Sequence, residues 1–288
     1  MEKLLHWSIA NSQDDKEAKD RIGQPDPKLL GQLFGMGPDE STLMKEGMAV
    51  ITNPEAELEK RLVAFDNFEM LIENLDNANN IENLKLWEPL LQMLNVPEAE
   101  LRSCALSCVG TASQNNVQTQ DSFLKYDGGL RKIISLAADS KEPTEVRIKA
   151  LYALSNLIRN HANCSQKFCE LHGLEIIPPI IQDLDANTKL KMRALSLLSA
   201  FLTSSVIDKK LILILRKENV IEPILECLDS TFDVNVVDRV LNILSQLISA
   251  KIELTEEERQ KLHVGMQKIE AEKDKLNEDD FLTVKSVL

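Results

Sequence analysis

The chain has 288 residues and a formal net charge of −13, with 43% hydrophobic but only 4% aromatic residues. A phosphate backbone is bound by a basic surface, and single-stranded bases stack on aromatic rings, so the composition argues against nucleic acid. We expect no nucleic-acid partner and a core built mainly from aliphatic side chains.

Membrane and secretory signals are missing from the pattern. No apolar run reaches the roughly 20 residues of a membrane span, and the first ten residues are too short and interrupted for a signal-peptide core. The five cysteines are odd in number and include no Cys-x-x-Cys pair, which is typical of reduced thiols. These features predict a cytoplasmic protein, with or without a nuclear fraction, that has no membrane partner.

The N-terminal part predicts little fixed structure. Residues 1–11 form a short amphipathic pattern, and between Asn11 and Lys28 only Ala18 and Ile22 are clearly apolar. So little apolar surface cannot offset the entropy lost when a backbone is ordered. We therefore predict a flexible segment over 1–41, with a short helix at 29–34.

A helix is expected from Ser41 to Thr52, ended by Asn53-Pro54. From about residue 55 to 250, five apolar helical runs then share one register. Their anchor residues, in steps of 41, 45, 44 and 46 residues, are Ala64, Ala105, Ala150, Ala194 and Val240. A unit of this length cannot bury its own apolar face, so the repeat predicts a stacked helical solenoid over 42–250. The charged, amphipathic tail over 251–288 predicts capping helices.

The third repeat shows the unit most clearly. A helix is expected from Glu142-Pro143-Thr144 to about Asn160-His161, a second over 165–171, and a third from Leu174 through Pro178-Pro179 to Leu184. The run from Ala150 to Asn156 and the turn at Gly173-Leu174 resemble the armadillo repeat. That resemblance implies an all-α, armadillo-like right-handed solenoid.

An armadillo stack lines its concave wall with one helix from each repeat. On that helix the residue before each anchor reads Val63, Cys104, Lys149, Arg193 and Arg239. The last three predict a basic row, and the Lys- and Arg-rich stretch from Thr188 to Lys217 supports it. The alternative is that these charges are simply solvated.

Armadillo proteins that bind extended peptides use ladders of Trp and Asn on the same wall. Here only Asn156 and Tyr152 occupy such positions. A ladder this short cannot hold a peptide along its length, so we expect the groove to bind a folded domain.

Catalytic and metal-binding patterns are weak. His161, Cys164, Cys169 and His172 are metal-capable, but their spacing matches no standard zinc finger. No phosphate-binding loop or nucleophile–base pair occurs. We expect a protein without metal or cofactor that is not an enzyme.

Three strings resemble the armadillo-type nucleotide exchange factors of heat-shock protein 70 (Hsp70), and the likeness extends over essentially the whole chain. They are residues 1–12, 24–30 and 74–84. The resemblance implies that the concave face of a monomer binds the ATPase domain of cytosolic Hsp70 and accelerates ADP release. It also implies binding roles for Arg193 and for Ala78, expected at the end of the first repeat's third helix, where a small side chain permits close approach. With the groove residues, the predicted chaperone-binding set is Ala78, Lys149, Asn156, Arg193 and Arg239.

By the same resemblance, residues 1–41 act as a release segment. Leu4, Leu5, Trp7 and Ile9 would occupy the peptide groove of the chaperone as a substrate mimic. The alternative is that Leu4, Trp7 and Ile9 cover the apolar face of the first repeat. The alternative function for the whole chain is an armadillo scaffold that binds a folded acidic partner without changing nucleotide turnover.

Overall fold

The computed structural model describes residues 39–288, except for 127 and 230. The amphipathic pattern over 1–11 and the helix predicted at 29–34 therefore lie outside the described residues. The chain divides into two compact units, Met1–Glu46 and Gly47–Leu288. The boundary falls inside α4 (Glu40–Thr52), which begins one residue before the predicted helix and ends with it.

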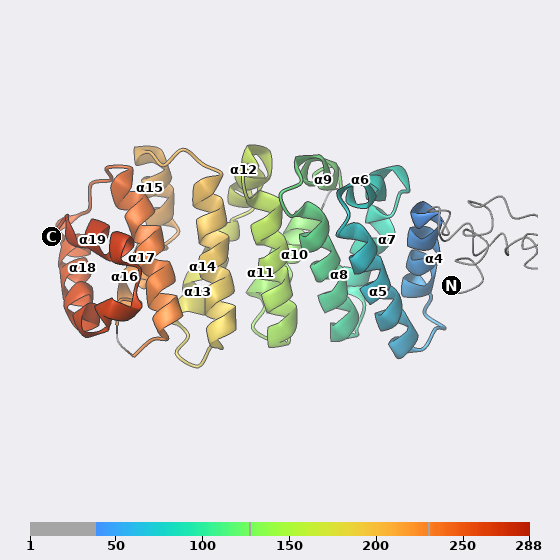
Figure 1. Cartoon of the computed structure of the whole chain (residues 1–288), viewed down its shortest axis with the longest axis horizontal. Coiled ribbons are helices and arrows are strands. Elements are labelled where there is room, and N and C mark those ends of the chain that lie inside the picture. The colour runs from blue at the N-terminus through green and yellow to red at the C-terminus, as the bar shows by residue number, and fades with distance from the viewer. Residues whose placement is uncertain (1–38, 127, 230) are drawn as a thin grey trace, which may run out of the picture. The chain divides into compact units, whose positions relative to one another are not determined.

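In the second unit, five long helices lie side by side in the order of the sequence (Figure 1). They are α5 (Leu58–Ile72), α8 (Ala99–Ser113), α11 (Thr144–Ile158), α14 (Thr188–Thr203) and α17 (Val234–Ser249). Each begins one of the five repeats predicted from the sequence. The first four each pack against the long helix of the next repeat. The five anchor residues are all buried, so the register read from the sequence is confirmed.

A second layer and a set of short helices complete the repeats. The second layer consists of α7 (Trp87–Gln92) with η1 (Met93–Asn95), α10 (Gly129–Ala138), η2 (Gly173–Ile176) with α13 (Ile177–Gln182), and α16 (Ile221–Glu226). Short helices connect the two layers: α6 (Leu75–Asn83), α9 (Val117–Phe123), α12 (Ala162–Glu170) and α15 (Lys209–Lys217). No strand occurs in 39–126, 128–229 or 231–288.

The same turn chemistry recurs in successive repeats. The side chains of Asn74, Asn116, His161 and Asp208 each accept a backbone N–H at the start of a short helix. Such caps satisfy donors that have no partner within the helix. At the far end of each short helix, Lys85, Gly128, His172 and Asn219 adopt the left-handed conformation, with φ between 52° and 86°.

The core between the layers is largely aliphatic, as expected from the composition. Ala150, Leu154 and Leu198, for example, are fully buried. An aromatic contact lies between the first two repeats, where the Trp87 ring centroid is 5.5 Å from that of Phe123 in an edge-on arrangement. Trp87 Nε1 also donates a hydrogen bond to Ser122 Oγ at 3.0 Å, so the buried indole N–H has its partner.

The C-terminal tail contains α18 (Glu256–Ile269), η3 (Glu270–Lys275) and α19 (Glu278–Lys285). Helix α18 packs on α16 and α19 packs on α17, so the tail covers the last helix of both layers. No helix in the described part of the chain combines the length and the apolar character needed to cross a membrane.

The third repeat differs from its predicted form at two boundaries. Helix α12 begins at Ala162, three residues early, because His161 caps it. The helix predicted from Leu174 to Leu184 is split into η2 and α13, which ends at Gln182. Pro178 and Pro179 lack the N–H needed inside a helix, and they therefore occupy the first turn of α13.

Candidate partner-binding surface

The exposed side of the long-helix layer, called here the long-helix face, brings two of the predicted cations onto one aromatic ring. Lys149 Nζ of α11 lies 6.0 Å from the ring centroid of Tyr152 on the same helix. Arg193 Cζ of α14 lies 5.1 Å from that centroid. Both cations are half-buried and within cation–π range, so Tyr152 holds charges from two neighbouring repeats together.

A hydrogen-bond network joins this pair to the first two repeats. Ser107 Oγ and Thr111 Oγ1 on α8 each donate to Glu69 Oε1 on α5 at 2.7 Å. Lys149 Nζ donates to Ser107 Oγ at 3.0 Å, and the Tyr152 hydroxyl lies 3.4 Å from Thr111 Oγ1. The carboxylate of Glu69 is thus engaged within the protein, one hydroxyl away from Lys149.

Gly110 creates the space in which Tyr152 lies. A Cβ added at Gly110 would stand 2.5 Å from Tyr152 Cε1 and 3.3 Å from the Cα of Ala153. No side chain fits at the first of these distances without moving the ring. The position of Tyr152, and therefore of both cations, depends on close approach between α8 and α11.

Arg159 and Arg239 form a second pair of cations on the long-helix face. Burial lowers the pKa of Arg159, and the charge of Arg239 lowers it further. The two side chains come from α11 and α17, which are separated by α14, and Arg159 Nη2 lies 3.5 Å from the backbone oxygen of Ser196 on α14. The Arg159 guanidinium therefore reaches α14, and the charge of Arg239 on α17 is near enough to affect it.

These four side chains are called here the four-cation set (Lys149, Arg159, Arg193 and Arg239). Within the part of the chain that the structure describes, no acidic group lies at ion-pair distance from any of them. Some basic residues elsewhere do have such partners, as in Arg102 with Glu142 at 2.6 Å and Arg216 with Glu258 at 2.7 Å. Half-buried cations without counter-charges make a surface suited to an anionic partner.

Asn156, the remaining predicted residue on this face, is also half-buried. Its Nδ2 donates to the backbone oxygen of Tyr152 at 3.2 Å. Its own backbone oxygen accepts from Gln120 Nε2 at 2.8 Å. The residue lies one turn beyond Tyr152, between the two pairs of cations along α11.

The placement of Ala78 needs correction. The long helix α5 ends at Ile72, and Ala78 lies on the separate short helix α6, where it is 3% exposed. The chain turns at Asn74, whose side chain accepts the backbone N–H of Asp76 at 2.9 Å and begins the new helix. So little of this side chain is exposed that the structure gives the close-approach argument no support, and a binding role for Ala78 stays a prediction.

The basic stretch from Thr188 to Lys217 supports the row less than expected. Lys191 is 5% exposed and lies over the Phe232 ring at 5.0 Å. Helix α15 lies outside the long-helix layer, and its Arg216 binds both carboxylate oxygens of Glu258. Of this stretch only Arg193 joins the four-cation set. Basic residues that are close in the sequence lie on different faces of the solenoid, and a count along the sequence does not distinguish those faces.

The four metal-capable residues of the sequence do not gather into one site among the described residues. His161 Nδ1 accepts the backbone N–H of Cys164 at 3.1 Å, and its Nε2 lies 3.0 Å from Asp121 Oδ1. Burial, with a smaller effect of Asp121, raises the pKa of the Cys164 thiol to about 12. His161 and Cys164 therefore serve the packing of the third repeat.

The sequence pattern did not indicate a role for Glu69, Ser107 or Arg159. It indicated Tyr152 only as the one aromatic residue at the ladder positions that bind extended peptides. One signal was available, because Ser107 and Tyr152 both stand two residues after their anchors and thus share a repeat position. Arg159 stands nine residues after its anchor, near the end of α11. Its approach to Arg239 joins positions 80 residues apart, and no local pattern indicates it.

Comparison with known proteins identifies relatives along the whole chain. Residues 1–81 match the family model described as nucleotide exchange factor Fes1, and residues 77–222 match the C-terminal domain of SIL1, FES1 and HPBP1. The protein of Saccharomyces cerevisiae named Hsp70 nucleotide exchange factor FES1 is 61% identical, with all of both chains covered. Proteins of the same name from Candida glabrata and Kluyveromyces lactis are 59% and 58% identical, over all of this chain and 99% of theirs.

Solved structures resemble the fold at low sequence identity. A designed armadillo repeat protein, YIII(Dq)4CqI, aligns with a TM-score of 0.66 at 15% identity, over 86% of this chain and 97% of its own. A related design solved with the peptide (KR)4 gives a TM-score of 0.65 at 15% identity, over the same shares. The armadillo-like, right-handed helical solenoid predicted from the sequence is thereby confirmed.

Proposed function

Because this chain belongs to the Fes1 family of Hsp70 nucleotide exchange factors, we propose that its long-helix face binds the ATPase domain of cytosolic Hsp70 and accelerates the release of ADP. The observation that carries this assignment of the surface is the four-cation set, which has no acidic partner in the described residues. The proposed counterpart is an acidic face of the ATPase domain.

Charge complementarity explains how the two proteins would meet. The chain as a whole carries −13, so the four-cation set, which lacks acidic partners in the described part of the chain, is a local exception that attracts an acidic surface. The proposed encounter is therefore salt-dependent. Tyr152 contributes by keeping the cations of α11 and α14 in fixed positions before the partner arrives, and Asn156, bonded to the Tyr152 backbone, lies beside it.

Exchange requires different affinities for two states of the chaperone. A surface that binds the open ATPase domain tenfold more tightly than the ADP-closed domain supplies about 1.4 kcal/mol toward opening. Rigid helices suit this task, since a face that adjusted to both states would favour neither. The proposed action involves no bond-making step, and the protein acts in the cytoplasm as a binding partner rather than an enzyme.

The sequence Leu4-Leu5-His6-Trp7-Ser8-Ile9 adds a second proposed contact. These residues lie outside the described part of the chain, and the proposal rests on their sequence alone. Leu4, Leu5, Trp7 and Ile9 would occupy the peptide groove of Hsp70, at an effective concentration of about millimolar set by the tether. A photo-crosslinker at Trp7 should label the peptide-binding domain, whereas labelling confined to the first repeat of its own chain would remove this contact.

Release of a fluorescent ADP analogue from Hsp70 tests the main proposal. Wild-type protein should accelerate release, and Arg193→Ala should be at least tenfold less effective at equal concentration. Arg131→Ala is the matched control, because Arg131 is an exposed arginine on α10 in the other layer and should leave the rate unchanged. Binding without acceleration would instead favour a scaffold, and equal activity of Arg193→Ala and wild type would remove the assigned surface.

A further inference from the structure

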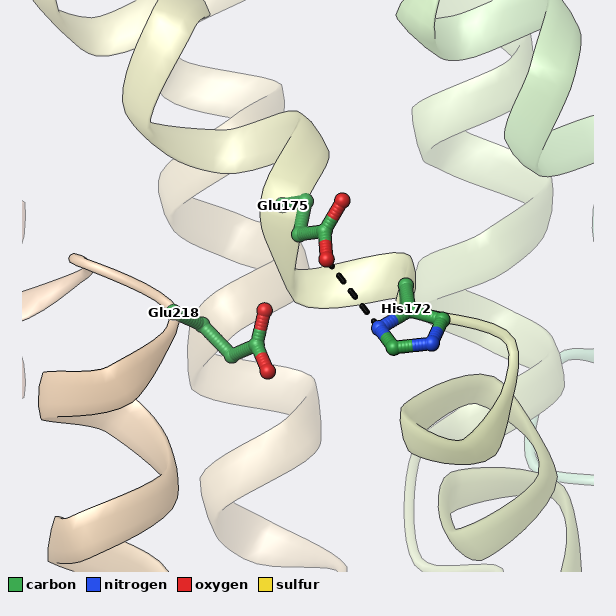
Figure 2. A group of neighbouring side chains, drawn as sticks. All are labelled: His172, Glu175 and Glu218. Carbon is green, nitrogen blue, oxygen red and sulfur yellow. Dashed lines mark ion pairs between the residues drawn. The ribbon is translucent and has the colours of Figure 1, made fainter.

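Away from the long-helix face, three side chains that can bind a metal ion meet between the third and fourth repeats. His172 follows α12, Glu175 lies in η2 and Glu218 ends α15. One ligand atom from each residue lies within 4.8 Å of the other two. Figure 2 shows the imidazole and both carboxylates directed into one space between the two repeats.

The ligand set has the chemistry of a transition-metal site. His172 Nδ1 already lies 3.0 Å from Glu175 Oε1, and the third donor comes from the neighbouring repeat. In a tetrahedral zinc site with bonds of 2.0–2.2 Å, ligand atoms stand about 3.4 Å apart. The observed spacing needs to close by at most about 1.4 Å, which the exposed side chains of His172 and Glu175 can achieve by rotation.

The donors discriminate among cations. Calcium and magnesium prefer six or more oxygen ligands, and an imidazole nitrogen suits neither. One nitrogen with two carboxylates suits zinc, which binds three protein groups and completes its shell with water. The thiol of Cys169, one turn before His172, is close enough to Glu218 for that charge to raise its pKa, after the larger effect of burial.

The local charge balance favours a dication. Glu175 and Glu218 place two carboxylates in one small space, and Lys217 Nζ, at 3.5 Å from Glu218 Oε1, is the cation paired with the second. The Glu218 side chain is 12% exposed, so its charge is only partly screened by water. A divalent ion would neutralise both carboxylates at once.

We propose that His172, Glu175 and Glu218 form a site for a divalent transition-metal ion, zinc above all, that links the third repeat to the fourth. In a solenoid each repeat touches only its neighbours, so one added link strengthens that junction directly. None of the three residues belongs to the long-helix face. The site therefore acts on the stability of the stack, independently of how Hsp70 is bound.

Titration of the full-length, chelator-treated protein with zinc chloride at neutral pH tests this site. Wild type should bind one ion, and the thermal midpoint should rise with zinc concentration. His172→Asn and Glu218→Gln should weaken binding by more than the roughly 10- to 100-fold that loss of an outer-shell partner costs. Asn is the substitution of choice at residue 172, because it tolerates the left-handed φ of 59°.

His263→Asn is the matched control, since His263 is an exposed histidine on α18. It should bind zinc as wild type does. The proposal is overturned if wild type shows no saturable binding, or if both variants keep wild-type affinity, which would place the ion on other groups such as the free thiols. The ADP-release activity of His172→Asn and Glu218→Gln should equal that of wild type. Failure of the zinc proposal would therefore leave the proposed exchange function untouched.

Discussion

The two ends of the long-helix face handle charge in opposite ways. At α5 and α8, Glu69 accepts hydrogen bonds from Ser107 and Thr111, while Val63 and Met70 are 52% and 63% exposed. At α11, α14 and α17 the four-cation set has no acidic partner among the described residues. The first end therefore offers exposed apolar side chains and the exposed carboxylate of Asp66, whereas the second offers positive charge.

This contrast explains how a protein of net charge −13 can present a basic surface. Net charge reports on solubility and long-range attraction, whereas binding depends on which charges lack partners. Tyr152 stands at the junction, bonded toward α8 and in contact with cations of α11 and α14. Substitutions on either side of this ring therefore test the difference between the two ends.

The largest expected effect is at the first end, in Ala78→Arg. Ala78 is 3% exposed on α6, so a long charged side chain must be accommodated in a packed interior. We expect the free energy of unfolding to fall by about 3 kcal/mol or more, measured by denaturant unfolding. Hsp70 binding should fall as well, because α6 packs against α5 and α8 and its displacement disturbs the face.

Leu75→Arg on the same helix is the control for this change. Leu75 is 58% exposed, and the substitution should leave stability within about 0.5 kcal/mol of wild type. If Ala78→Arg were as stable as Leu75→Arg and still failed to bind, direct contact between Ala78 and the partner would be supported.

The next largest effect is expected at Gly110, which lies against the Tyr152 ring between the two ends of the face. Gly110→Ala places a Cβ 2.5 Å from the Tyr152 ring, and we expect it to lower the free energy of unfolding by about 2 kcal/mol. Gly47→Ala is the control, because its Cβ would meet only the backbone oxygen of Ala64 at 3.9 Å. That helix substitution should stabilise by about 0.5–1 kcal/mol. Equal effects of the two substitutions would show that Gly110 is not needed for the position of the ring.

The register of the repeats was predictable from the sequence. Which side chains form the long-helix face was predictable only in part. Apolar anchors such as Ala105 and Ala150 reveal the long helices because helical periodicity is local. The burial of Ala78 was hidden, because it depends on where Asn74 turns the chain. Lys191 was counted in the basic stretch that supported the row, although the two positions between it and Arg193 rotate its side chain by about 200° and place it over Phe232.

A smaller effect is expected when the ring is removed without disturbing the backbone. Tyr152→Leu deletes the π face beneath Lys149 and Arg193, and should weaken Hsp70 binding by about 1 kcal/mol, or roughly fivefold. Tyr152→Phe keeps the ring and should bind nearly as wild type. Surface plasmon resonance at two salt concentrations measures both.

A thermodynamic cycle with Arg193→Ala separates positioning from general destabilisation. If Tyr152 acts through Arg193, Tyr152→Leu should cost little further affinity once Arg193 is absent. Full additivity of the two losses would show that the ring does not position the arginine.

The smallest effect on stability is expected at Asp229 in the C-terminal part of the chain. Like Glu69 at the first end, this carboxylate is bonded within the protein. Lys268 Nζ donates to Asp229 Oδ2 at 2.7 Å, and this bond, aided by hydrogen bonds from Thr231, lowers the pKa of Asp229 to about 2 from an ordinary 3.8. A lowered carboxylate pKa stabilises the folded state above the unfolded-state value and loses that contribution as pH falls through the folded-state value. Asp229→Asn should therefore lower stability at neutral pH by at most about 1 kcal/mol, because Lys268 is half exposed. Urea unfolding should show this stability difference between variant and wild type shrinking between about pH 4 and pH 2. A difference that stayed constant across that window would mean that Asp229 contributes through hydrogen bonding or packing rather than through its charge.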